Sequence, residues 1–202
     1  MTNYKLLFFN TRVRGEPARL IFAEAGVEYE DKRFEESEWP EIQPTTPFGK
    51  VPVLYIDDKP PLAQSGAIVA YLGREFGLDA GSPLADAYAH MLFKTFDDVG
   101  MLLPYLEEDP VKKAELTEEA LEEHINPVLA RMEKDFKAGG NDFLVGKKLT
   151  YVDLGFWNFC DIVSVFDKTF LTKFPTLDAL CKRVAARPNI KKYLENRPPT
   201  PF

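Results

Sequence analysis

The spacing of apolar residues divides the chain into two parts with different periods. Up to Phe76, short aliphatic and aromatic runs typical of strands alternate with apolar positions at helical spacing. Pro17 suits the first turn of a helix, and Gly26 suits its end. The predicted order is therefore β-α-β-loop-β-β-α, with strands at residues 4–9, 27–34 and 51–56, a polar connection at residues 35–46, and helices at residues 17–26 and 65–76.

After this first part the apolar period becomes helical and stays so. Residues 77–83 are dense in Gly, Ser and Pro, which favours a linker. Thr150, with Asp153 three residues later, predicts the capped start of a helix, and Pro127 should bend a helix or move its start. The predicted fold class is an α/β domain at residues 1–76, a linker at 77–83 and an all-α domain at 84–202, with helices at 84–106, 117–137, 150–166, 174–186 and 189–196.

The segment from residue 47 to residue 72 carries the clearest chemical signal in the first part. Pro52 interrupts an aliphatic run and cannot donate a hydrogen bond to a central sheet ladder. Ser65 stands directly before an apolar helical run, so we predict it as the N-cap. The N–H groups of that helix start would favour an anionic, peptide-like ligand. An ordinary ββα unit without a ligand explains the same pattern equally well.

Composition and charge restrict the function classes. The net charge of −7 argues against binding to nucleic acid, which needs a basic surface. There is no apolar run of about 18 residues to cross a membrane, and no apolar signal segment at the start. Cys160 and Cys181 are interpreted as buried free thiols rather than as a disulfide, and His90 and His124 lack metal-ligand spacing, so no metal is predicted. We expect a cytoplasmic protein.

Short motifs follow one another in a fixed order along essentially the whole chain. They are YKLLFFN at 4–10, RVRGE at 12–16, EWP at 38–40, PFGKVPVL at 47–54, QS at 64–65, AI at 67–68, YL at 71–72, FDD at 96–98, Gly146 with LTYVD at 149–153, and RPPTPF at 197–202. In this order they resemble the cytosolic glutathione S-transferases, most closely the sigma class, which includes haematopoietic prostaglandin D synthases and many invertebrate enzymes. The resemblance implies a thioredoxin-like N-terminal domain followed by a helical domain.

The resemblance implies a binding site for glutathione as co-substrate. Pro52 matches the cis-proline of the family, which turns the backbone of Val51 toward the cysteinyl part of the tripeptide. Gln64 and Ser65 match the residues that hold the γ-glutamyl carboxylate. The implied glutathione-binding set is Trp39, Gln43, Gly49, Lys50, Val51, Pro52, Gln64, Ser65 and Asp97.

Three members of this set carry further expectations. Trp39 and Lys50 match residues that meet the glycyl end, whereas at Gln43 many relatives have a lysine, so one charge toward the glycyl carboxylate is missing in this chain. Asp97 matches an acidic residue that reaches the glutathione of a neighbouring subunit, which implies a homodimer. Trp39 as a packing aromatic and Asp97 as a solvated helix charge are the simpler interpretations of these two positions.

One position breaks the pattern of the family. Its catalytic tyrosine, whose hydroxyl hydrogen-bonds the glutathione sulfur, is replaced by Phe8. Lowering the pKa of a thiol by two units takes about 2.7 kcal/mol, and one hydrogen bond to a charged group supplies about 1.5–3 kcal/mol. Either Arg14 and backbone N–H groups give an attenuated activity, or a hydroxyl from Thr11 substitutes, although Thr11 fits better as an ordinary loop residue. Otherwise the protein binds glutathione or apolar ligands without catalysis, as crystallin-like relatives do, or Phe8 is an engineered change.

The second substrate is expected between the two domains, among mostly apolar residues that suit a hydrophobic electrophile. The expected residues are Phe9, Val13, Arg14, Gly100, Leu103, Pro104, Tyr105 and Phe202. Tyr105 stands where prostaglandin D synthases carry a tryptophan, which argues against that isomerase activity. Because there is no cysteine before residue 81, thioredoxin-type redox chemistry is excluded. We predict a glutathione transferase that acts on apolar electrophiles or organic peroxides, with a non-catalytic glutathione binder or crystallin-like protein as the alternative.

Overall fold

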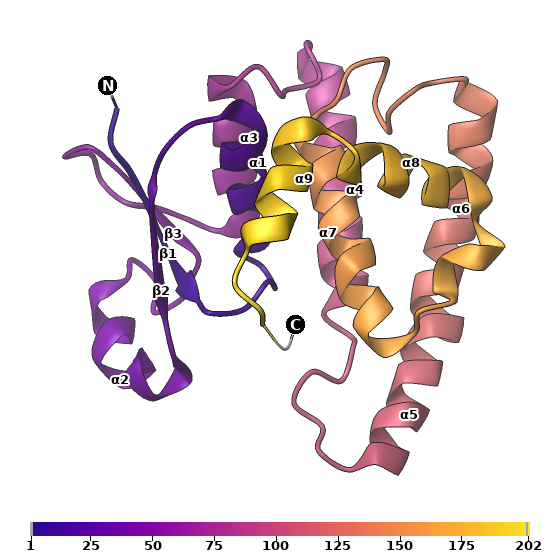
Figure 1. Ribbon diagram of the computed structural model, residues 1–202, viewed down its shortest axis with the longest axis horizontal. Coiled ribbons are helices and arrows are strands. Elements are labelled where there is room, and N and C mark those ends of the chain that lie inside the picture. Colours follow the sequence, from indigo (N-terminus) through magenta and orange to yellow (C-terminus); the bar gives the residue numbers. More distant parts are fainter. Residues whose placement is uncertain (1, 201) are drawn as a thin grey trace. The chain divides into compact units, whose positions relative to one another are not determined.

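The computed structural model describes residues 2–200 and 202, which form two compact units (Figure 1). The first unit contains residues 2–79 and 187–200, and the second contains residues 80–186 with Phe202. The domain boundaries drawn from the sequence stay a prediction. They assign residues 187–200 to the helical domain, whereas the structure groups these residues with the first unit. These residues pack in the first unit because helix α9 (Pro188–Asn196) lies against helix α1 (Glu16–Ala25). Between them Tyr193 donates a hydrogen bond to Glu16 over 2.9 Å.

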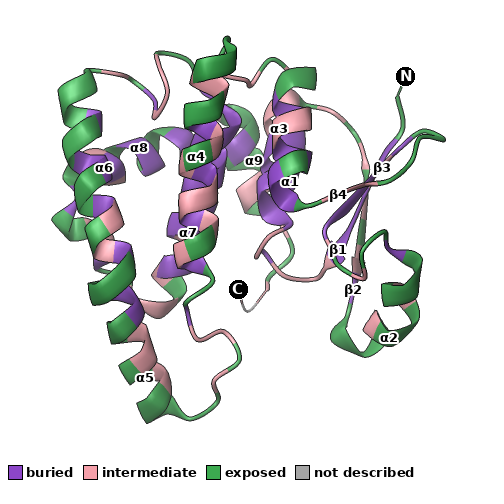
Figure 2. Ribbon diagram, turned by 180° about the vertical axis from the view of Figure 1, so that it is seen from behind, coloured by how far each residue is buried: buried purple, intermediate pink, exposed green. Residues whose placement is uncertain are grey.

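The first unit is built on a four-stranded mixed sheet in the order β2-β1-β3-β4. The central strand β1 (Tyr4–Phe9) runs parallel to β2 (Glu30–Phe34) and antiparallel to β3 (Val53–Ile56), which in turn pairs antiparallel with β4 (Leu62–Ala63). Figure 2 shows buried residues concentrated along β1, β3 and α1. Helix α1 packs against helix α3 (Ser65–Glu75), and the thioredoxin-like α/β arrangement predicted from the sequence is confirmed.

Several predicted elements of the first unit have different bounds in the structure. Strand β2 begins at Glu30, and strand β3 begins at Val53, after Pro52 rather than through it. The connection at residues 35–46, expected to be a polar loop, forms short helical turns. Pro40 and Pro44 fit these turns because each lies in the first turn of a helix, where a proline is tolerated. They are η1 (Glu36–Glu38), α2 (Trp39–Ile42) and η2 (Gln43–Thr45).

The second unit is helical, as predicted. Its apolar centre is α7 (Tyr151–Phe166), which packs against α4 (Pro83–Gly100) and α8 (Pro175–Ala185). In the part of the chain that the structure describes, no helix is both long enough and apolar enough to cross a membrane. The remaining elements are α5 (Pro110–Glu119), the π-helical segment η3 (Ala120–Ile125), α6 (Asn126–Gly139) and η4 (Phe170–Lys173).

Two helix predictions in the second unit need correction. The helix expected at 84–106 ends at Gly100, and Tyr105 folds back so that its hydroxyl donates to the carbonyl of Gly100 over 2.7 Å. The helix expected at 117–137 is continuous from Pro110 and contains the π-helical turn η3, and Pro127 is the second residue of α6, directly after that turn. That Pro127 bends this helix or moves its start stays a prediction.

The predicted start of α7 is confirmed. The carboxylate of Asp153 accepts hydrogen bonds from the N–H of Leu144, and from both the N–H and the hydroxyl of Thr150, over 2.8–2.9 Å. Burial raises the pKa of Asp153 to about 6, and these donated hydrogen bonds oppose the rise. The capping box therefore fixes the N-terminus of the most buried helix of the unit.

Candidate functional site

Several of the predicted glutathione-binding positions lie at one end of the sheet because of its register. Leu7 pairs with Val53 across β1 and β3, and Val53 pairs with Ala63 across β3 and β4. The last residues of β1, the segment before β3 and the start of α3 therefore lie at the same end of three neighbouring strands. Phe8, Val51, Pro52, Gln64 and Ser65 lie on these three segments, whereas Trp39 and Gln43 lie on the helical turns after β2 and Asp97 lies on α4.

The segment before β3 carries the predicted tripeptide contacts Val51 and Pro52. Their peptide bond is cis, as the resemblance implied. Val51 precedes the paired residues of β3 and is partly buried against the apolar cluster of Leu7, Phe34 and Val53. The backbone of Val51 thus lies at the sheet end outside the β-ladder, where an extended peptide can pair with it.

Trp39 and the loop after α2 lie beside this end of the sheet. Trp39 is partly buried, with its ring stacked on Phe34 at 5.8 Å and tilted against Phe9 at 5.4 Å between ring centroids. Gln43 is exposed, and its Nε2 donates to the carbonyl of Gly49 over 3.3 Å. Gly49 has a φ of 60°, a left-handed conformation that favours glycine. Gln43 therefore supports the turn that carries Lys50, whose side chain is exposed.

The start of α3 differs from the sequence prediction by one residue. Ser65 is not the N-cap but the first residue of the helix, and the N-cap is Gln64, which has a φ of 75°. The first intrahelical hydrogen bond runs from the N–H of Ile68 to the carbonyl of Gln64. The N–H groups of residues 65–67 thus precede the first helical hydrogen bond, and Ser65 is 7 % exposed beside them. This geometry suits a carboxylate ligand.

Phe8 occupies the end of β1 and is only 4 % exposed. Its ring meets Phe9 edge-on at 5.8 Å, and the guanidinium of Arg19 lies 5.8 Å from the ring centroid. A Cβ placed on Gly15 would lie 2.4 Å from Cδ1 of Phe8, so the start of α1 requires glycine for the ring to pack there. The side chain at this position is firmly held but carries no hydroxyl to donate to a sulfur.

The loop between β1 and α1 carries the other two candidates for sulfur activation. The hydroxyl of Thr11 donates to the carbonyl of Val13 over 3.4 Å, a local contact of the kind that loop residues make. Arg14 is partly buried and follows Val13 through a cis peptide bond. Arg14 brings a fixed positive charge to the loop, as does the buried Arg12.

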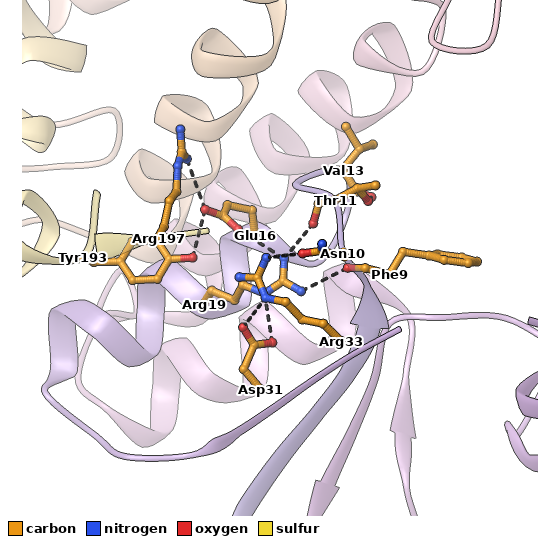
Figure 3. A network of polar contacts seen from close by, with 10 residues as sticks. All are labelled: Phe9, Asn10, Thr11, Val13, Glu16, Arg19, Asp31, Arg33, Tyr193 and Arg197. Carbon is orange, nitrogen blue, oxygen red and sulfur yellow. Dashed lines mark hydrogen bonds and ion pairs between the residues drawn. The ribbon is translucent and has the colours of Figure 1, made fainter. Parts of the chain in front are cut away.

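The guanidinium of Arg19 binds the backbone of the loop between β1 and α1 (Figure 3). It is fully buried, and its two terminal nitrogens donate to the carbonyls of Phe9 over 3.2 Å and Thr11 over 2.7 Å. Its charge is balanced by ion pairs with Glu16 at 3.2 Å and Asp31 at 3.0 Å. One buried side chain therefore fixes the backbone on both sides of Asn10.

The same network continues to β2 and α9. Arg33 donates to Asp31 over 2.8 Å and to Asn10 over 3.2 Å, and Glu16 accepts from Tyr193 and Arg197. Burial opposes the charge of Arg33, yet the hydrogen bond and the negative charge of Asp31 raise its pKa overall. This network was not predicted from the sequence. The one local indication of the network in the sequence is Arg19, a charged residue directly before Leu20 and Ile21 on a helix whose apolar residues predict burial.

The second unit brings together several residues predicted for the second substrate. Tyr105 packs its ring against Phe202 at 5.1 Å and Phe166 at 5.5 Å. Leu103 is buried, Pro104 is partly buried, and a Cβ on Gly100 would lie 3.3 Å from the ring of Phe159. These residues form an apolar group around the end of α4.

Asp97 lies on α4 and is paired within its own chain. Lys94 donates to its carboxylate over 2.7 Å, and the side chain of Asp97 is 10 % exposed. Charge pairing with Lys94 was not expected from the sequence, although the spacing of three residues on a helix permits it. In residues 2–200 and 202, no three His, Cys, Asp or Glu side chains lie so as to hold a metal ion.

The chain matches two protein-family models. One is described as the N-terminal domain of glutathione S-transferase and matches residues 4–74; the other is described as the C-terminal domain and matches residues 98–197. Haematopoietic prostaglandin D synthase of Gallus gallus is 40 % identical over 99 % of both chains, and glutathione S-transferase 1 of Ascaris suum is 37 % identical over 100 % of both. The solved structure of monomeric Na-GST-3, a glutathione S-transferase of Necator americanus, superposes with a TM-score of 0.90 at 32 % identity, covering 99 % of this chain and 100 % of that one.

Proposed function

The chain belongs to the glutathione S-transferase family, and on this premise we propose how its site binds glutathione and activates the sulfur. It is a glutathione transferase, since its relatives are named glutathione S-transferases and prostaglandin D synthases. The observation that carries the proposed site is the meeting of the end of β1, the segment before β3 and the start of α3 at one end of the sheet. The reaction is attack by the glutathione sulfur on an apolar electrophile or an organic peroxide.

Glutathione binds through backbone groups and short polar side chains. The γ-glutamyl carboxylate accepts from the N–H groups at the start of α3 and from the hydroxyl of Ser65, with Gln64 beside it. The cysteinyl part pairs with the backbone of Val51 as an added strand, and the cis peptide before Pro52 supports this orientation. The glycyl end meets Trp39 and Lys50.

The sulfur is activated without a tyrosine. Phe8 offers no donor, and the hydroxyl of Thr11 is used within its own loop. Arg14 is the remaining candidate, because a positive charge near the sulfur favours the thiolate over the thiol. A charge alone orients the thiolate less well than a short hydrogen bond, so we infer an attenuated conjugation rate.

The second substrate is proposed to be apolar. The expected residues Phe9 and Val13 in the first unit, and Leu103, Pro104, Tyr105 and Phe202 in the second, are aliphatic or aromatic. The hydroxyl of Tyr105 is already bound to the carbonyl of Gly100, which leaves the ring as the part offered to a substrate. The tyrosine at this position argues against prostaglandin isomerase activity.

We further infer a sigma-class, cytoplasmic homodimer with a role in detoxification. Helix α4 supports the dimer, because Leu84, Tyr88 and Met91 lie at helical spacing on one side and are 66 %, 52 % and 55 % exposed. A second copy would cover this apolar side. Because Asp97 is paired with Lys94, it would have to change partner to reach the glutathione of the neighbouring subunit. Light scattering at several concentrations tests the dimer, and a mass equal to one chain throughout would refute it.

The alternative is a protein that binds glutathione without catalysis. The lack of a hydroxyl at Phe8 favours this alternative. Two measurements separate the proposals. Retention on immobilised glutathione tests the binding site, and no retention would refute it. Conjugation of an aryl halide above the uncatalysed rate tests the chemistry; retention without conjugation would support the non-catalytic binder.

A further inference from the structure

A polar groove lies between strand β2 and helix α9 in the first unit. It has a volume of about 430 Å³, and Ala23 and Gly26, at the end of α1, line part of it. Binding sites for small molecules have volumes of about 300–1,000 Å³, so the groove is large enough for a small organic ligand. None of its lining residues belongs to the predicted glutathione-binding set.

The charged side chains that line this groove are mostly cationic. They are Arg33, Lys192 and Arg197, with Asp31 as the carboxylate among them. Three positive charges and one negative charge leave an excess of two positive charges in the groove, although the whole chain has a net charge of −7. A local excess of positive charge in an acidic protein favours an anionic ligand at this place.

Arg33 is held in place while part of its guanidinium is unused. Its Nε donates to Asp31 over 2.8 Å and its Nη1 donates to Asn10 over 3.2 Å (Figure 3). Within the described residues, its Nη2 has no hydrogen-bond partner, and the side chain is 15 % exposed. Because two bonds already orient the guanidinium, little conformational entropy is lost when its third nitrogen binds an anion.

The side of the groove that α9 contributes is fixed through Glu16. The carboxylate of Glu16 accepts from the hydroxyl of Tyr193 over 2.9 Å and from Nη1 of Arg197 over 3.2 Å (Figure 3). Lys192, directly before Tyr193, is exposed and forms no ion pair with any residue that the structure describes. Its flexible side chain can therefore turn toward a ligand in the groove.

Asn189 and Asn196 give the groove its uncharged polar groups. The side-chain nitrogen of Asn189 donates to the carbonyl of Glu24 over 2.9 Å, and that of Asn196 donates to the carbonyl of Lys192 over 2.7 Å. Each amide is thus anchored through its nitrogen, and its oxygen is an acceptor for a hydroxyl group. Acceptors beside cations suit a ligand that carries both hydroxyl groups and negative charge.

We propose that this groove binds a small phosphate monoester with a hydroxylated body, a sugar phosphate in chemical class. The phosphate lies against Arg33, Lys192 and Arg197, because guanidinium groups donate paired hydrogen bonds to phosphate oxygens. Its charge of about −1.5 to −2 at neutral pH matches the excess of positive charge in the groove. The hydroxyl groups of the body donate to the amide oxygens of Asn189 and Asn196.

An NMR titration of the full-length, ¹⁵N-labelled protein tests the proposal. The probes are glucose 6-phosphate, inorganic phosphate and glucose, added at constant ionic strength. We expect saturable shifts of backbone amide resonances in β2 and α9 with glucose 6-phosphate, weaker binding of inorganic phosphate and no binding of glucose. The same shifts should appear when glutathione is present in excess, since the groove shares no residue with the predicted glutathione-binding set.

Three results of this titration would overturn the proposal. The first is the absence of saturable shifts in β2 and α9. The second is the loss of these shifts when glutathione is present, which would place the phosphate ester in the glutathione site. The third is equal affinity for inorganic phosphate and glucose 6-phosphate, which would leave no role for the amides of Asn189 and Asn196.

A pair of lysine variants separates the groove from the general charge of the surface. Lys192→Gln should weaken the binding of glucose 6-phosphate by about 5-fold, the size expected for one exposed charge. Lys191→Gln is the matched control, because Lys191 is the neighbouring exposed residue of α9 and does not line the groove. Equal weakening by the two variants, or unchanged binding in Lys192→Gln, would overturn the proposal.

Arg33→Gln removes the guanidinium that the proposal places against the phosphate. Binding of glucose 6-phosphate should weaken by about 10-fold or more, because a hydrogen bond between charged groups is lost. Since Arg33 also binds Asp31 and Asn10, circular dichroism establishes that the variant is folded before the titration. Unchanged affinity in the folded variant would contradict the assigned position of the phosphate.

Discussion

The two halves of the candidate glutathione site are built from different parts of the chain. The half proposed to bind the tripeptide depends on the backbone: the segment around Val51 outside the β-ladder and the N–H groups at the start of α3. The half proposed to meet the sulfur depends on side chains, namely Phe8 and Arg14, and on the buried Arg19, which binds the carbonyls of their loop. A backbone site tolerates most substitutions, whereas a side-chain site can lose its chemistry through one. On the proposed site, a single side chain such as Phe8 would therefore weaken the activation of the sulfur and leave the binding of the tripeptide unchanged.

The largest expected effect comes from removing the support of the sulfur half. Arg19→Leu leaves the buried carboxylate of Glu16 and the carboxylate of Asp31 without one cation and frees the carbonyls of the loop. Breaking a buried ion pair costs about 3–5 kcal/mol of the free energy of unfolding, measured by urea titration. In the folded fraction, conjugation should fall more than retention on glutathione.

A matched control separates burial from charge. Arg131→Leu removes an exposed arginine whose partner is Asp135, one turn further along α6. An exposed pair contributes about 0–1 kcal/mol, so this variant should unfold close to the wild type. If the two variants lost equal stability, the buried network of Arg19 would not be what supports the loop.

Ser65→Ala tests the binding half. We expect glutathione affinity to fall by about 10- to 100-fold, because one hydrogen bond to a charged group contributes about 1.5–3 kcal/mol. Isothermal titration measures the change, and Ser37→Ala, on an exposed helical turn, is the control. The pH profile of conjugation should not move, since Ser65 is proposed to hold the carboxylate and not the sulfur. A shifted profile with unchanged affinity would assign Ser65 to the other half.

Arg14→Gln tests the sulfur half with a smaller effect. Removing the positive charge should raise the pKa of the bound glutathione thiol by about one unit, or about 1.4 kcal/mol. The rate at neutral pH then falls and the rise of the pH–rate profile moves to higher pH, while affinity changes little. Arg74→Gln, an exposed arginine at the end of α3, serves as the control. An unmoved profile would exclude Arg14 as the activating group.

The sequence predicted what depends on local pattern. The first strand, the capping of α7 by Thr150 and Asp153, and the order of helices follow from periodicity and turn residues, whereas β2 and β3 begin later than predicted. The cis bond before Pro52 was implied by the family resemblance. The N-cap of α3 was predicted one residue late, because the positive φ of Gln64 has no sequence signal in a residue other than glycine or asparagine.

The sequence did not predict contacts between distant segments. The network of Arg19 joins α1, β2 and α9. Residues more than a few turns apart meet only through the tertiary fold, so no local spacing announces them. The interpretation of the two cysteines as buried free thiols, which follows from the local apolar pattern, is confirmed.

The most direct test of the central claim is Phe8→Tyr. The new hydroxyl should donate to the glutathione sulfur, lower the pKa of the bound thiol and raise aryl halide conjugation at neutral pH by about 10- to 100-fold, equivalent to about 1.5–3 kcal/mol. Retention on immobilised glutathione should stay the same, and Phe48→Tyr, 71 % exposed, should change neither quantity. If Phe8→Tyr left both the rate and the thiol pKa unchanged, the missing hydroxyl would not be what limits this site, and the claim that Phe8 weakens the sulfur half would be wrong.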